Sequence, residues 1–182
     1  MEDLLEAIAD NVSAIVLALA RKDKAVGGRD IVPATEAIKV AVDRMCATSQ
    51  STARNPGIEE EARRVLLETS GELAGVSARL VAAARESRDD AGGNGQRRAM
   101  KESKELLRKV TLLLMLEDQI NINFLVQSGK RVEEAVGRAA CAADAAQAAQ
   151  AVPEAALALQ DFLRRVRLRA DVTRDGSDDK TR

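Results

Sequence analysis

The sequence predicts an all-α protein, built as an up-and-down antiparallel four-helix bundle whose long fourth helix extends into a partial second bundle. Composition is the first reason, because the 182 residues are 46% hydrophobic but only 1% aromatic, whereas a β-protein of this size would fill its sheets with more aromatic residues. The apolar residues are mostly Leu, Val, Ile and a large excess of Ala, the best helix former. Apolar residues also recur three and four positions apart, and Pro and Gly separate the segments that show this spacing.

Residues 3–22 are predicted to form the first helix. Its apolar residues have the spacing of a seam between packed helices: Leu5, Ile8, Val12, Ile15 and Leu19. Acidic residues at its start and basic residues at its end suit the helix dipole. The segment is expected to end by Gly27 and Gly28.

Two further helices are predicted from Pro33 and from Asn55. Proline suits the first turn of a helix, and the second helix then fades in the polar residues 48–52. Its apolar face consists of Ile38, Ala41, Val42 and Met45. Asn55 is expected to cap the third helix, with Pro56 in its first turn, and the glycine cluster 92–95 is expected to end it.

The fourth helix is predicted to begin near Arg97 and to be long. No proline follows until Pro153, so it can reach about residue 150 unless Gly129 or Gly137 breaks it. A helix of about 50 residues would span about 80 Å and needs a second packing unit. Its core-facing residues are expected to be Leu106, Leu107, Val110, Leu113, Leu114, Ile120 and Phe124.

A fifth helix is predicted from Pro153 to Arg169, followed by a polar tail without apolar anchors. We therefore expect a four-helix bundle over residues 1–125, a helical extension or partial second bundle over 126–170, and a disordered tail over 171–182.

Missing residue types exclude several classes of function. Without histidine the chain has no imidazole base, no histidine metal ligand and no Ser-His-Asp triad, so we expect no enzyme, no metal site and no cofactor. Two Phe residues cannot form a base-stacking platform, and a net charge of -1 provides no basic field for nucleic acid.

An acidic N-terminus and the lack of a long uncharged apolar run predict neither a signal peptide nor a transmembrane segment. Cys46 and Cys141 are expected to be reduced and buried.

The apolar faces of the first two helices form a candidate binding site. A partner helix with apolar residues at i, i+3, i+4 and i+7 can insert between two bundle helices and replace their mutual contacts. The residues that would line such a partner-helix seam are Ile8, Val12, Ile15, Leu19, Ile38, Val42 and Met45. The same residues serve equally well as the core of the bundle, and the sequence leaves both interpretations open.

A basic cluster in the fourth helix is the second candidate, as a contact with an anionic surface. It consists of Arg97, Arg98, Lys101, Lys104, Arg108 and Lys109. Glu102 and Glu105 lie among these residues, so a solvated face of ion pairs is the alternative.

Glu117 and Asp118 interrupt the apolar run of the fourth helix. As neighbours on a helix they point about 100° apart, so we do not expect a catalytic carboxylate pair. A solvated stripe with one or two buried polar residues that fix the helix register is the expected structure.

Three stretches resemble the vinculin/α-catenin family. Residues 4–16, LLEAIADNVSAIV, resemble the first helix of that family. The connection at 27–33, followed by AIKVAV at 37–42, resembles vinculin's first loop and second helix. Residues 100–118 are similar to α-catenin, in which a basic, Ala-rich helix start leads into a Leu-Leu-x-x-Val-Thr-x-Leu-Leu run and then an acidic residue. The resemblance covers about residues 1–130.

The resemblance implies a non-enzymatic adaptor of the cytoskeleton and cell adhesion. In that family the N-terminal unit is two four-helix bundles that share a long helix. Vinculin's first bundle opens between its first two helices to accept an amphipathic talin helix, and the α-catenin bundle exchanges helices with β-catenin or with a second copy. The resemblance thus implies an amphipathic helix of a talin- or catenin-like protein as the partner, an indirect link to actin, and a cytoplasmic location at the cytoskeleton or at cell junctions.

Two other functions stay open at this point. One is a bundle that responds to lipid and opens on an anionic membrane surface, which the amphipathic helices and the basic residues would support. The other is a purely structural homo-oligomer, in the simplest case a homodimer, in which small Ala faces pack helices of different copies together.

Overall fold

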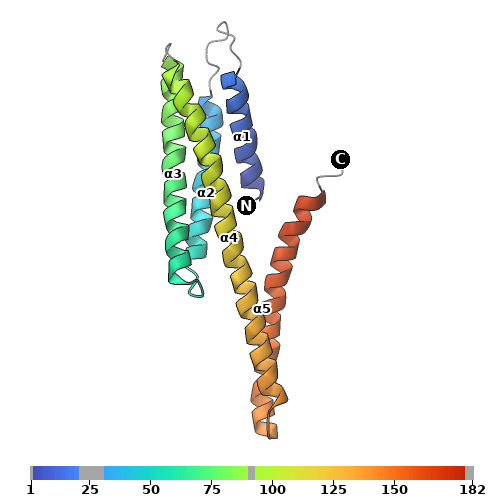
Figure 1. Ribbon diagram of the computed structural model, residues 1–182. Helices are drawn as coiled ribbons and strands as arrows, with labels where there is room; N and C mark the ends of the chain where they lie inside the picture. The colour runs from blue at the N-terminus through green and yellow to red at the C-terminus, as the bar shows by residue number, and fades with distance from the viewer. Residues whose placement is uncertain (1, 21–30, 90–92, 179–182) are drawn as a thin grey trace. The chain divides into compact units, whose positions relative to one another are not determined.

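The computed structural model describes residues 2–20, 31–89 and 93–178 (Figure 1). Over these residues the chain forms five α-helices and no strand, which confirms the all-α prediction. The helices are α1 (Glu2–Ala20), α2 (Val32–Ala53), α3 (Glu60–Asp89), α4 (Asn94–Ala140) and α5 (Ala145–Asp178). Gly27, Gly28 and Gly92, which were expected to separate helices, lie outside the described residues.

The chain divides into two compact units, Met1–Glu117 (unit 1) and Asp118–Arg182 (unit 2). Unit 1 contains α1, α2, α3 and the first part of α4, and unit 2 contains the rest of α4 and α5. The domain boundaries predicted at residues 125 and 170 stay predictions, because compactness alone does not define a domain.

Aliphatic side chains from four helical segments form the core of unit 1. α2 packs against both α1 and α3, and the first part of α4 runs alongside them (Figure 1). The largest fully buried side chains include Ile8, Ile15, Ile38, Met45, Leu66, Leu73, Leu80, Leu106 and Leu113. Burying one such side chain contributes about 1.5–3 kcal/mol, so these residues supply most of the driving force for folding.

Ion pairs add a second kind of contact between α3 and α4. Arg79 Nε lies 3.0 Å from Glu102 Oε2, and Arg98 pairs with Glu86 in the same way. These side chains are partly exposed, and such pairs contribute little to stability.

The helix starts match the sequence signals in one case and differ in another. Pro33 lies in the first turn of α2, as predicted. Asn55 does not cap α3, which begins at Glu60; its Oδ1 accepts a hydrogen bond of 3.0 Å from the Gly57 N–H instead. The prediction for α3 was therefore wrong by about one turn, because the asparagine closes a local turn before the helix begins.

α4 is continuous through both glycines that were expected to be able to break it. It ends at Ala140, well before residue 150. A Cβ on Gly129 would lie 3.6 Å from the Phe162 Cε2 atom, so this glycine sits in ordinary contact with a ring of α5. A glycine costs about 1 kcal/mol against Ala within a helix, which a long and otherwise favourable helix tolerates.

α5 begins at Ala145 and not at Pro153, which lies inside the helix. The reason is a reciprocal cap that the sequence analysis missed. The Gln147 N–H donates to Asp144 Oδ1 at 2.8 Å, and the Ala143 N–H donates to Gln147 Oε1 at 3.1 Å. This Asp-x-x-Gln arrangement satisfies two backbone donors at the helix start, so the signal was present in the sequence.

Residues 171–178 belong to α5, and the disordered tail expected over 171–182 stays a prediction. No proline follows Pro153, so nothing in that stretch forces the helix to end. Residues 179–182 lie outside the described part of the chain.

In unit 2, α5 returns alongside α4. Arg138 Nη2 lies 3.4 Å from Glu154 Oε2, and the Arg165 guanidinium lies 5.5 Å from the centre of the Phe124 ring. Several apolar side chains of α5 are nevertheless exposed: Val152, Leu157, Leu159, Leu163 and Val166.

The burial pattern of α4 yields a test with neighbouring residues. Leu113 is fully buried, whereas Leu112 is 41% exposed. We expect Leu113→Ala to lower the free energy of unfolding by about 2–5 kcal/mol, because it leaves a cavity in the core. Leu112→Ala should lower it far less in the same urea titration, and equal effects of the two variants would show that the helix faces the core differently.

Candidate functional site

The partner-helix seam lies between α1 and α2, which pack directly against each other. Six of its seven residues are at most 3% exposed, and Leu19 is partly exposed. The structure therefore brings the predicted residues together in the core of unit 1. A partner helix reaches them only when α1 and α2 separate.

Polar contacts tie the other helices of unit 1 together but do not involve the side chains of residues 4–19 of α1. Among residues 4–19, the only side-chain hydrogen bond is local, from Asn11 Nδ2 to the Ala7 carbonyl at 2.7 Å. Between α2 and α3, by contrast, Arg85 Nη2 lies 3.2 Å from Glu36 Oε1, and Cys46 Sγ donates to the Ser70 carbonyl at 3.4 Å. Within its described side chains, α1 is thus held by apolar contacts, which are non-directional.

A buried polar contact joins α2 to α4 one turn beyond Met45. Ser49 Oγ donates to Glu117 Oε1 at 2.5 Å and also lies 3.1 Å from the Met45 carbonyl oxygen. Glu117 is 8% exposed, and its burial raises the pKa of the carboxyl, which the hydrogen bond from Ser49 partly offsets. Asp118 is exposed, so one of the two carboxylates is buried and its neighbour is not, which agrees with the expected absence of a converging carboxylate pair.

Two further hydroxyls are buried in unit 1 without a partner. Ser77 on α3 and Ser103 on α4 are at most 1% exposed, and neither Oγ atom forms a hydrogen bond with the described residues. A buried hydroxyl that lacks a partner costs about 1–3 kcal/mol. These two residues therefore weaken the closed form of the unit.

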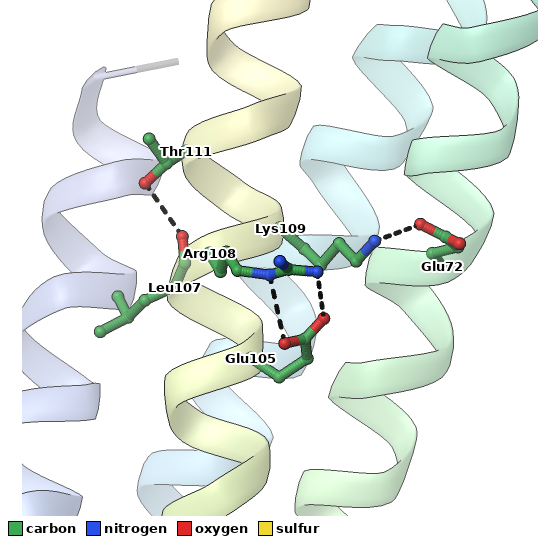
Figure 2. Close-up of polar contacts among 6 residues, drawn as sticks. All are labelled: Glu72, Glu105, Leu107, Arg108, Lys109 and Thr111. Atoms are coloured by element: carbon green, nitrogen blue, oxygen red, sulfur yellow. Dashed lines mark hydrogen bonds and ion pairs between the residues drawn. The ribbon is translucent and has the colours of Figure 1, made fainter.

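Three of the six residues of the basic cluster form ion pairs, two of which Figure 2 shows. Lys109 pairs with Glu72 of α3, and Arg108 Nε lies 3.3 Å from Glu105 Oε2 on its own helix. Arg98 pairs with Glu86, as described above. These three residues therefore belong to a solvated face of ion pairs, which was the alternative to a contact with an anionic surface.

The remaining three residues of the basic cluster form a stripe. Arg97, Lys101 and Lys104 are exposed and make no ion pair with the residues that the structure describes. Their spacing of four and three places them on one face of α4. This stripe is the part of the cluster that can contact an anionic surface.

The cysteines differ from each other. Cys46 is buried, and burial raises the pKa of its thiol. Cys141 is exposed, which corrects the expectation that both are buried. The reason is that α4 ends at Ala140, so Cys141 lies in the connection to α5 and not on a packed face.

Residue clusters typical of metal sites or membrane spans are not found in the described ranges. No group of three or more Cys, Asp or Glu side chains there could hold a metal ion. Among the helices over residues 2–20, 31–89 and 93–178, none is long and apolar enough to cross a membrane.

Comparison with known proteins finds one informative similarity. Over 140 residues the chain is 35% identical to a protein of Dictyostelium discoideum described as probable vinculin. The aligned region covers 76% of this chain but spans only 16% of the length of that relative. No family model matches the chain. No solved structure matches it either. The similarity points to a vinculin-like helical region.

Two serine substitutions are expected to change the free energy of unfolding in opposite directions. We expect Ser103→Ala to raise the free energy of unfolding by about 1 kcal/mol, because it removes a buried donor that has no acceptor. Ser49→Ala should lower it, because it leaves Glu117 without its partner. Urea titrations monitored by circular dichroism measure both, and a destabilising Ser103→Ala would indicate that its hydroxyl has a partner.

Proposed function

We propose that this chain is a non-enzymatic adaptor of the vinculin/α-catenin family. In this proposal unit 1 is an up-and-down four-helix bundle that binds an amphipathic helix of a talin- or catenin-like protein at the partner-helix seam. The protein acts in the cytoplasm, at the cytoskeleton or at cell junctions, and its link to actin passes through its partners. The similarity to a protein described as probable vinculin supports the family.

The observation that carries the proposal is how α1 is attached. Within residues 4–19, its side chains make no ion pair or hydrogen bond to another helix, whereas α2, α3 and α4 are joined by several. Displacing α1 from α2 therefore breaks apolar contacts, which an incoming helix with the same apolar spacing restores. The net cost of the exchange is small because the buried apolar area is similar before and after.

A binding experiment with matched variants tests this proposal. Fluorescently labelled talin and catenin helices are titrated with the chain, and anisotropy reports binding. Val12→Asp should abolish binding because it places a charge in the seam. Ser13→Asp, at the exposed neighbouring position, should bind like the unmodified chain.

A second control keeps the chain unmodified. A partner helix whose apolar face carries Asp residues should fail to bind, which separates loss of the seam from unfolding of the Val12→Asp variant. If none of the helices binds the unmodified chain, or if Val12→Asp binds as well as Ser13→Asp, the seam is not the site.

Contact with an anionic membrane surface is the second candidate function, and the stripe of Arg97, Lys101 and Lys104 favours it. Each basic residue near such a surface contributes about 1 kcal/mol. We expect the double variant Lys101→Glu, Lys104→Glu to lose co-sedimentation with phosphatidylserine vesicles at low salt. The variant Arg98→Gln, which removes a residue already paired with Glu86, should lose little. Equal losses from both variants would exclude the stripe.

A further inference from the structure

The contact between Ser49 and Glu117 leaves open which of the two side chains supplies the proton of the hydrogen bond. The Ser49 hydroxyl carries one proton, yet its oxygen lies 2.5 Å from Glu117 Oε1 and 3.1 Å from the Met45 carbonyl oxygen. Both neighbours are acceptors if Glu117 is ionised. Because the hydroxyl has a single proton, it can then donate to the carboxylate or to the carbonyl, but not fully to both.

A protonated Glu117 provides a second proton for these contacts, in addition to the Ser49 backbone N–H that the Met45 carbonyl accepts within α2. Its own O–H donates to Ser49 Oγ, and the Ser49 O–H is then directed at the Met45 carbonyl. The resulting chain runs from α4 through Ser49 to the backbone of α2. It places no charge in a site where the carboxyl is 8% exposed.

The charged groups around Glu117 do not compensate an ionised carboxylate. On the neighbouring turns the exposed charged groups are Arg44 of α2, Arg54 directly after α2, Arg64 and Glu68 of α3, Glu6 of α1 and Asp118 of α4. Arg63 of α3 is partly buried, but it is bound to Glu60 and to the Ala53 carbonyl. Cys46, the buried titratable group of α2, has a thiol whose raised pKa keeps it neutral. Burial raises the pKa of Glu117 by more than the hydrogen bond from Ser49 lowers it.

We propose that Glu117 is a proton-binding site that clasps α4 to α2, and that loss of its proton favours opening of the partner-helix seam. On deprotonation the proton passes to water, the Ser49 hydroxyl turns to the carboxylate, and the Met45 carbonyl loses this donor. A buried charge then remains between α2 and α4, and a movement of α2 that opens the partner-helix seam also exposes this charge to water. The control of seam opening rests on the proposed partner-helix site, whereas the protonation of Glu117 does not.

The sign of the pH dependence follows from the direction of the pKa shift. Glu117 has a raised pKa in the closed unit and its ordinary value of 4.5 when the unit opens. The closed form thus has its full stability below pH 4.5 and loses part of it as the pH rises through the closed-state pKa. Partner binding, which needs the open form, is favoured as the pH rises.

The clasp is tested first by carbon-13 NMR titration of the glutamate carboxyl carbons in the full chain. We expect the Glu117 signal, assigned through its own backbone resonances, to titrate at a higher pH than those of exposed glutamates such as Glu6. Glu117→Gln should remove that signal and no other. A Glu117 signal that titrates with or below the exposed glutamates overturns the proposal without any variant having to fold.

Partner binding is then measured at pH 5 and pH 8. Affinity of the unmodified chain for the partner helix should rise several-fold with pH. In Glu117→Gln, whose amide donates a hydrogen bond as the protonated acid does, the affinity should be the same at both pH values. In the control Glu6→Gln, the affinity should rise with pH as in the unmodified chain. A raised titration with no binding at either pH would leave the clasp in place and refute the partner-helix site. Binding with the same pH dependence in Glu117→Gln would refute control of the seam by Glu117.

Discussion

Burial of aliphatic side chains along α2 is the interaction on which the structure of unit 1 depends. α2 is the helix that packs against both α1 and α3, and it also meets α4 through Ser49 and Glu117. Its buried face includes Ile38, Val42 and Met45. Because these side chains are apolar and carry no aromatic ring, their packing is strong in sum but weakly directional. The other contacts of the unit act on helices that α2 already holds in place.

Polar contacts make the unit asymmetric. α3 and α4 are joined by ion pairs such as Arg79–Glu102, α2 and α3 by an ion pair and a buried hydrogen bond, and α2 and α4 by the buried hydrogen bond between Ser49 and Glu117. The described side chains of α1 take part in none of these. Two buried serines whose hydroxyls form no hydrogen bond within the described part of the chain lower the stability of the closed form further. A unit with this distribution of contacts is suited to release α1 more readily than its other helices, which is the property that an adaptor of the proposed kind needs.

Local signals explain how much of the fold could be predicted from the sequence. The spacing of Ile8, Val12 and Ile15 identified a packed face because an α-helix repeats every 3.6 residues. Proline was a reliable start signal at Pro33 and a misleading one at Pro153, where the reciprocal cap of Asp144 and Gln147 begins the helix earlier. Asn55 misled for the related reason that its side chain can cap a helix or close a turn, and only the path of the chain decides between them.

The sequence by itself determined that this protein is helical, where its aliphatic faces lie, and which residue types are absent from its chemistry, because these follow from composition and periodicity. Only the tertiary structure decided which polar residues are buried and what they meet. Glu117 and Asp118 are adjacent carboxylates with the same local surroundings in sequence, yet one is buried against Ser49 and the other is exposed. Likewise, the basic cluster divides into paired and exposed residues according to whether a glutamate of α3 or α4 is within reach. Partners distant in sequence meet only when helices pack, so such distinctions cannot be read from the chain before it folds.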